Sequence, residues 1–214
     1  MAVAGKSQTK PAAADSDPFD RSDLKERRRK AVIRAAASLF SRKGFHNTSM
    51  DDVAAELSVS KPTLYNYFPT KQKLLYEFHM AALDDGEAAL AYAQSAGKNG
   101  HQKLVAMCRR NMEDTLSGQG PCAFVADVDS LPAEDRAKVV TRRDRISAGV
   151  RDIIEEGNRD GSLKKLDPSL GTLFVTSVLN WIPVWYRPDG ERSPEEIVTA
   201  FLDMFQTGLA RKRI

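Results

Sequence analysis

The sequence has only two cysteines, Cys108 and Cys122, among 214 residues. They cannot build the disulfide framework of a small secreted protein, so we expect a reducing, cytoplasmic environment. No apolar run approaches 18 residues, and the first residues lack the apolar segment of a secretory signal. The densest apolar stretch, 170–185, is interrupted by Asn180 and Pro183. We therefore expect no membrane-spanning segment and no membrane partner.

Motifs of catalysis and of metal binding are also missing. The sequence contains no glycine-rich phosphate loop and no Gly-x-Ser-x-Gly nucleophile motif. Its histidines, His46, His79 and His101, lie far apart and have no partner at a metal-ligand spacing. We expect no metal, no cofactor and no enzyme activity; a small helical enzyme is the alternative, and it would need titratable groups that converge in a cavity.

Charge is unevenly distributed along the chain. The net charge is only +3, but residues 21–43 hold nine Lys and Arg against two Asp and Glu. A basic front on a nearly neutral body suggests an anionic partner that binds at one end. A helix whose charged face is merely solvated is the alternative.

Helical periodicity extends over nearly the whole chain after a tail at 1–20, which we expect to be disordered. No stretch alternates with the period of a β-strand, so the sequence predicts an all-α fold of about nine helices. Capping residues, prolines and glycines mark the expected boundaries. The helices are expected at about 24–43, 49–57, 61–68, 71–96, 101–117, 121–129, 133–159, 168–186 and 194–209.

The second and third of these segments have the length and spacing of a helix-turn-helix. Val53, Ala54 and Leu57 are expected to face inward from the first, and Leu64 and Phe68 from the second. The second segment then presents donors and acceptors outward, and these suit base edges and phosphates. The expected DNA-binding residues are Arg28, Thr48, Ser49, Lys61, Pro62, Thr63, Tyr65, Asn66, Tyr67 and Lys71.

At these positions the sequence resembles the N-terminal domain of the TetR family of transcriptional regulators. The resemblance covers about residues 25–80 and rests on the runs 48–54 and 59–71, with Lys43-Gly44-Phe45 before them. It departs at Ser58, where the family usually has glycine in the turn; a left-handed backbone there would cost on the order of 1 kcal/mol.

The resemblance implies a role for each part of the chain. Residues 21–70 would form the DNA-binding domain, with Lys61, Thr63 and Tyr65 at base edges in the major groove. Thr48, Tyr67 and Lys71 would bind phosphates, and Arg28 a phosphate or the minor groove. Residues 71–214 would form an effector-binding and dimerisation domain. For the tyrosines, simple packing is the alternative, and for the arginine run, a solubilising charge.

The C-terminal half resembles the FadR and KstR groups of the family more loosely, through Asn180–Gly190 and Ser193–Glu196. This implies a repressor that a small apolar or acyl-CoA-like effector releases from a palindromic operator. An architectural DNA-binding protein without an effector is the alternative, which the absence of a cavity would favour. Arginines at 109–110 and at 142, 143 and 145 could meet a ligand phosphate, although a solvated helix face is the simpler interpretation.

Two apolar stripes near the C-terminus suggest half of a four-helix bundle that a two-fold axis completes. The expected dimer residues are Phe174, Val178, Phe201, Met204 and Phe205. The expected effector-binding residues are Met107, Met112, Phe124, Trp181 and Trp185, with plain core packing as the alternative for each.

Overall fold

The computed structural model describes residues 18–117 and 127–208, and within them every regular element is helical. The prediction of an all-α fold is confirmed, with eight α-helices and one 3-10 helix in the described part of the chain. The elements are α1 (Pro18–Lys43), α2 (Met50–Glu56), α3 (Lys61–Tyr67), α4 (Lys71–Ala96), α5 (Gly100–Leu116), η1 (Val128–Ser130), α6 (Ala133–Asp160), α7 (Pro168–Trp185) and α8 (Pro194–Thr207).

Side-chain caps determine where most helices begin. In each case a side-chain oxygen accepts a hydrogen bond from the backbone N–H three residues later, which satisfies a free donor of the first turn. The capping residues are Ser49, Ser60, Thr70, Asn99, Asp167 and Ser193. At the other end of α1, Gly44 adopts a left-handed φ of 80° and donates to the Phe40 carbonyl, as its position after two basic residues predicts.

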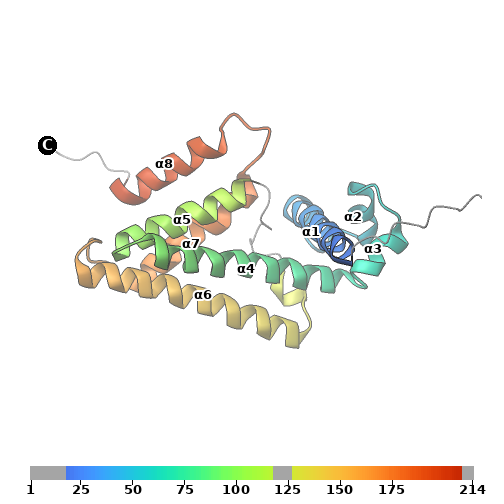
Figure 1. Ribbon diagram of the computed structural model, residues 1–214, viewed down its shortest axis with the longest axis horizontal. Coiled ribbons are helices and arrows are strands. Elements are labelled where there is room, and N and C mark those ends of the chain that lie inside the picture. Colours follow the sequence, from blue (N-terminus) through green and yellow to red (C-terminus); the bar gives the residue numbers. More distant parts are fainter. Residues whose placement is uncertain (1–17, 118–126, 209–214) are drawn as a thin grey trace, which may run out of the picture.

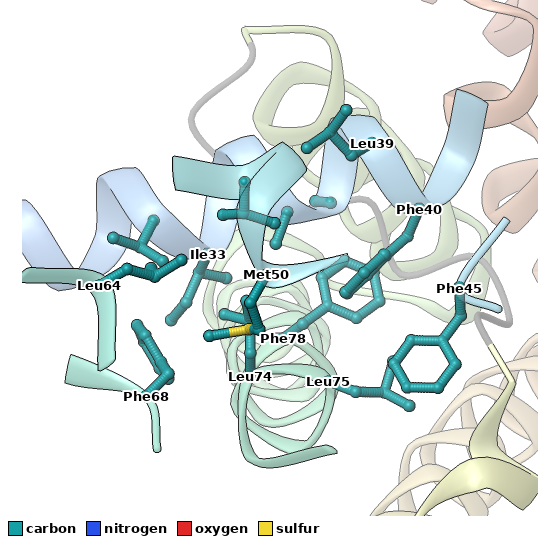
Figure 2. Packing of buried hydrophobic residues seen from close by; sticks show 14 of the residues in the cluster. Ile33, Leu39, Phe40, Phe45, Met50, Leu64, Phe68, Leu74, Leu75 and Phe78 are labelled. Carbon is teal, nitrogen blue, oxygen red and sulfur yellow. The ribbon is translucent and has the colours of Figure 1, made fainter. Parts of the chain in front are cut away.

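The helices α1, α2 and α3 gather at one end of the molecule and pack on the beginning of α4 (Figure 1). Figure 2 shows their shared apolar core, in which Phe40 packs edge-on against Phe45 and Phe78. Leu74 and Phe78 of α4 are as deeply buried there as Leu64 of α3. We call α1, α2, α3 and the start of α4 the N-terminal head. Its core extends beyond residue 70 into the first half of α4.

The remaining helices form a body around α4, α5 and α6. The long helices α4 and α6 pack along each other, α5 packs against both, and α7 and α8 lie against α5 (Figure 1). A second apolar core joins these helices and includes Met112, Ile153 and Ile182. No helix in the described part of the chain is long and apolar enough to cross a membrane.

Two expected boundaries differ from the structure. Helix α1 begins at Pro18, inside the segment 1–20 that was expected to be disordered; residues 1–17 lie outside the described residues. The helix expected at 121–129 falls mostly on undescribed residues, and its end is the 3-10 turn η1. The composition of the tail continues into the first helical turn, so composition alone could not locate the start of α1.

Candidate functional site

Helix α3 presents a polar face to solvent above a buried anchor. Leu64 is fully buried and Phe68, which follows the helix, is 1 % exposed, so the orientation of α3 on the head is fixed by packing. The opposite face is exposed at Lys61, Pro62, Thr63, Tyr65 and Asn66, whereas Tyr67 is half-buried. The structure thus brings the predicted base-reading side chains together on one surface.

Contacts within the surface orient two of these side chains. The hydroxyls of Ser60 and Thr63 lie 2.8 Å apart, and the Thr63 amide donates to Ser60 Oγ. The Lys61 ammonium forms an ion pair with Asp51 of α2, and its hydrogen bond to that carboxylate raises the Lys61 pKa. Lys61 is therefore a cation that already has an internal partner, which DNA must replace.

The start of α2 is held by a reciprocal capping box. Asp52 N donates to Ser49 Oγ at 3.1 Å, and Ser49 N donates to Asp52 Oδ2 at 2.8 Å. The hydrogen bonds from Ser49, helped by Lys43, lower the pKa of Asp52 to about 2. Ser49 is exposed and lies at this helix terminus, where the macrodipole favours an anion such as a phosphate.

Thr48 does not have the position expected of a phosphate ligand. Its side chain is 1 % exposed, and its hydroxyl donates to the Gly44 carbonyl at 2.8 Å. The hydroxyl therefore closes the loop between α1 and α2, and a direct phosphate contact from it is ruled out in this conformation. The sequence motif could not distinguish the two roles, because Thr48 and Ser49 both carry a hydroxyl near the helix start.

Lys71, which was predicted to bind a phosphate, also holds the protein backbone. Its Nζ donates to the carbonyls of Phe45 and Thr48, both at 2.9 Å, and lies 4.1 Å from the centre of the Phe45 ring. Because an ammonium has three donors, one remains for a phosphate. The first residue of α4 is thus tied to the loop that precedes α2.

The basic residues near the start of α1 differ in their surroundings. Arg28 is exposed, whereas Arg29 forms an ion pair with Glu77 of α4 and lies over the Phe68 ring. Burial alone would raise the pKa of Glu77, but hydrogen bonds from Lys73 and Arg29 lower it, so the group is anionic at neutral pH. Arg28 therefore retains the predicted access to DNA, and Arg29 joins α1 to α4.

The turn between α2 and α3 contains a left-handed residue at the position where the family usually has glycine. Ser58 has a φ of 53°, a conformation that a residue with a Cβ adopts at a cost. Its neighbour Val59 is exposed. The turn therefore keeps the geometry that glycine usually provides, and the serine carries the strain.

The body contains an inner cavity of about 230 Å³ between α4, α5, α6 and α7. Its wall is mainly apolar, and its polar residues are His79, Asn111, Arg143, Ser147, Thr176 and Asn180. Met107, one of the predicted effector-binding residues, lines this cavity. A mainly apolar cavity with a few polar groups is the usual form of a small-molecule site.

A larger space of about 580 Å³ is lined by residues of α5, α7 and α8 and of the loop between α6 and α7. Cys108 is part of its wall, and burial raises the pKa of this thiol to about 12. The thiol is protonated at neutral pH, so it is not poised to act as a nucleophile or a redox switch. Within the described residues no three His, Cys, Asp or Glu side chains converge to hold a metal.

Most of the other predicted effector residues lie elsewhere. Trp181 and Trp185 are 51 % and 40 % exposed on the outer side of α7, and neither lines the two cavities. Met112 is fully buried in the body core, and Phe124 lies outside the described residues. The two tryptophans do not line a cavity because of their position on α7. Leu179 of the same helix faces the core, so residues on the opposite side of the helix face outward.

That outward stripe belongs to a large exposed apolar face. Phe174 and Met204 were predicted to lie at a dimer interface and are exposed there, while Val178, Phe201 and Phe205 are half-buried. Sequence reasoning missed the leucines at the start of α7, although they continue the same helical spacing. The exposed large apolar residues of α7 and α8 are Leu170, Leu173, Phe174, Trp181, Trp185 and Met204.

Comparison with protein families adds an independent observation. Residues 32–78 match the model of bacterial regulatory proteins of the tetR family, and residues 97–209 match a tetracyclin repressor-like C-terminal domain. The second match alone covers more than half of the chain. The chain belongs to the TetR family. The resemblance found in residues 25–80 is thereby confirmed.

Individual TetR-family relatives extend the comparison over nearly the full length. The chain is 26 % identical to the HTH-type transcriptional repressor KstR2 of Rhodococcus jostii (strain RHA1), over 90 % of this chain and 96 % of that protein. It is 31 % identical to the TetR-family regulator PfmR of Thermus thermophilus, with a TM-score of 0.69 over 84 % of this chain and 99 % of that one.

One similar structure contains both a small molecule and DNA. The crystal structure of AibR in complex with isovaleryl coenzyme A and operator DNA has a TM-score of 0.69 and 25 % identity, over 83 % of this chain and 97 % of that one. These relatives are transcriptional regulators, a different class of protein from the enzyme that was the alternative.

Proposed function

We propose that this TetR-family chain is a dimeric repressor that binds a palindromic operator and leaves it when an effector enters the body. The observation that carries the proposal is the polar face of α3, held outward by buried Leu64 and Phe68. An exposed recognition helix that displays lysine, threonine, tyrosine and asparagine suits the donors and acceptors of the major groove. The named repressor among its relatives supports the same function.

A dimer follows from the exposed apolar face of α7 and α8. Six large apolar side chains gather there, an unusual density for a surface that contacts only water. A two-fold pairing of this face would place two α3 helices on one DNA duplex. Half-sites about one helical turn apart, or a multiple of that, then require a palindromic operator.

Effector control is supported by the continuity between the head and the inner cavity. Helix α4 contributes Leu75 and Phe78 to the head core, and just beyond them His79, Ala82 and Leu83 line the cavity. Val128 of η1 packs against the same head core and also lines the cavity. A ligand that displaces these residues acts directly on the packing that positions α3.

The links between α4 and the head make this coupling tight. Lys71 binds the carbonyls before α2, and Glu77 pairs with Arg29 of α1. A shift of α4 therefore moves α1 and α2 with it, which changes the separation of the two α3 helices in a dimer. A coupling free energy of about 1–3 kcal/mol would weaken operator binding roughly 5–150-fold.

The cavities also bear on the architectural alternative. A protein that only bends or packages DNA has no use for internal space, and cavities reduce stability because they forgo packing contacts. The body nevertheless holds the inner cavity of about 230 Å³. This observation favours a ligand-responsive regulator.

The test is a selection of genomic DNA fragments by the purified full-length protein at near-physiological salt. We expect enrichment of one palindromic sequence. Thr63→Ala should relax preference at one base position in each half-site, while Tyr67→Ala should weaken binding to all sequences alike. Recovery of fragments without a shared sequence would contradict an operator-binding repressor and support the architectural alternative.

A further inference from the structure

The loop between α1 and α2, residues 44–49, is held from two directions, and we call it the head loop. From one side, Lys71 of α4 donates hydrogen bonds to two of its carbonyls. From the other side, His46 Nε2 lies 3.3 Å from the hydroxyl oxygen of Ser130 and 3.9 Å from a carboxylate oxygen of Asp127. This second contact joins the head to η1, which belongs to the body and is far away in the sequence.

The η1 turn lies between the head core and the inner cavity. Leu131, the residue after η1, is buried in the same apolar cluster as Phe45 of the head loop, and Val128 packs against that cluster. Val128 also lines the inner cavity. Its neighbour in the sequence is Asp127, so the residue that meets His46 directly precedes a residue of the cavity wall.

Asp127 has an uncommon backbone conformation. Its φ of 28° and ψ of 54° lie near the left-handed region, which residues with a Cβ rarely adopt. The Ser130 amide donates to the Asp127 carbonyl at 2.8 Å and closes the turn. Such a backbone persists only where its surroundings hold it, and it is typical of switch regions. In this conformation the Asp127 carboxylate and the Ser130 hydroxyl both lie near the His46 ring.

The two carboxylates of this segment have different partners. Asp127 meets the head through His46, whereas Asp129 forms an ion pair with Arg136 of α6 at 3.0 Å, within the body. Asp127 and Asp129 are only two residues apart, so they provide a matched pair for an experiment. Neutralisation of either one makes the same change in charge, and only one of the two changes loosens the contact with the head.

We propose that η1 is a second link between the inner cavity and the DNA-binding head, separate from α4, and that His46 is its positioning residue. A ligand that displaces Val128 moves Asp127 and Ser130 away from His46 and loosens the head loop. The head loop ends at Ser49, the exposed cap of α2, where a phosphate is expected to bind. This inference rests on the proposed function, because it identifies how the body of that regulator acts on its head.

The link acts through position and contributes little to stability. The His46 side chain is 74 % exposed and that of Asp127 is 42 % exposed, and ion pairs at such exposed sites contribute little to the free energy of unfolding. While the link is intact, the head loop is already ordered when DNA arrives. Without it, DNA binding must order the loop, and this cost lowers the affinity. Substitutions in the link should therefore change DNA affinity by a few-fold and leave the protein folded.

The first experiment measures, by fluorescence anisotropy, the affinity of the full-length protein for the palindrome that the genomic selection recovers. Asp127→Asn should weaken binding about threefold because the link is loosened. Loss of a negative charge alone would have the opposite effect, since it favours binding to the phosphates of DNA. Asp129→Asn makes the same charge change and should not weaken binding. If Asp127→Asn binds the palindrome as tightly as Asp129→Asn, the proposal is overturned.

Variants of His46 distinguish a positioning role from a direct contact with DNA. His46→Ala should weaken binding about fivefold, whereas His46→Gln, whose amide can still donate to Ser130, should bind within about twofold of the parent. In the double variant Asp127→Asn, Ser130→Ala the link is already lost, so a further His46→Ala should change the affinity less than about twofold. An equal loss from His46→Ala in both backgrounds would show that His46 contacts DNA itself, and would overturn the link.

Amide hydrogen exchange tests the link without DNA. The Thr48 amide donates to the Phe45 carbonyl at 3.1 Å inside the head loop, so a loosened loop should exchange its amides severalfold faster. We expect this for His46→Ala and not for Asp129→Asn, with thermal unfolding midpoints that verify the fold of each variant. Unchanged exchange in His46→Ala would overturn the link. Faster exchange in a protein that binds no palindrome would support the link and refute the proposed function.

Discussion

Several polar side chains of the head form hydrogen bonds or ion pairs within the head itself. Thr48 closes the loop after α1, Lys71 holds two carbonyls of the same loop, and Lys61 is paired with Asp51. Ser58 holds a strained turn. The residues that orient α3 are therefore interleaved with those available to DNA, so a substitution in this region changes stability and binding to different extents.

Ser58→Gly should stabilise the protein. Glycine adopts the φ of 53° without the penalty that a Cβ imposes, so the free energy of unfolding should rise by about 1 kcal/mol. For a chain of this size the melting temperature should rise by roughly 2–4 °C. Thermal unfolding followed by circular dichroism measures the effect.

The matched control for this change is Ser38→Gly, at an exposed position of α1. There the backbone is helical, and glycine should lower the free energy of unfolding by about 0.5 kcal/mol. A lower melting temperature for both variants would mean that the turn at Ser58 is not strained.

Asp51→Asn should strengthen binding to DNA of any sequence. The substitution removes the carboxylate that pairs with Lys61 and leaves the ammonium free for a phosphate. We expect affinity to rise about threefold to tenfold at low salt, with base preference unchanged. Fluorescence anisotropy with operator and unrelated DNA measures both, and Asp152→Asn on α6 serves as the control for charge alone.

At the scale of elements, helix α4 belongs to both the head and the body. Its first turns are buried in the head core, and its middle forms a wall of the inner cavity. Arg142 holds it to α6 through Asp84 and Glu87, and Arg29 holds it to α1 through Glu77. It also carries a half-buried acid, Asp85, which lies near Asp114 of α5.

Asp85→Asn should stabilise the protein near neutral pH. Burial, reinforced by Asp114 and Asp84, raises the pKa of Asp85 to about 6, although Lys30 and Arg110 oppose the shift. The folded state then binds a proton more tightly than the unfolded state, so ionisation of this group lowers stability as pH rises from about 4 to 6. After allowance for solvent screening, the variant should gain about 1 kcal/mol at pH 7.5.

The pH profile distinguishes this cause from a general packing effect. The difference in unfolding free energy between variant and parent should shrink as pH falls from 6 towards 4, because Asp85 of the folded state is then protonated and the unfolded state gains its proton as the pH approaches its ordinary pKa of 3.8. Denaturant unfolding at pH 7.5, 6 and 4.5 measures it. A difference that stays constant across this range would show that ionisation of Asp85 is not responsible.

At the scale of the whole molecule, the exposed apolar face of α7 and α8 is larger than a monomer needs. Helix α7 begins at the cap and proline Asp167-Pro168, and α8 begins at Ser193-Pro194. The inward-facing apolar residues of both helices complete the body core. The outward stripes remain uncovered in a single chain. A symmetric partner would bury them and complete a four-helix bundle.

Leu173→Glu should convert the proposed dimer to a monomer. The leucine is 60 % exposed on the apolar face, and a two-fold axis would bring two new carboxylates into one interface. We expect a halved mass by light scattering and at least tenfold weaker binding to a palindrome. Tyr92→Glu, at an exposed position of α4, is the control and should remain dimeric.

The sequence by itself determined the elements of this protein. Helical periodicity, the capping residues and the glycine at Gly44 are local signals, because each acts through a backbone hydrogen bond or a single dihedral angle within a few residues. The polar face of α3 was predictable for the same reason, since Leu64 and Phe68 lie one helical turn apart and orient the helix between them.

Only the tertiary structure decided which residues lie in the sites of the body. Trp181 and Met112 are both large apolar residues of expected helices. Trp181 lies on the surface and Met112 in the core, because the neighbouring helices determine which side of each helix is covered. The burial of Thr48 and the place of Arg143 in the wall of the inner cavity depend on packing between helices. Such contacts arise from packing in three dimensions, which the pattern along one helix does not contain.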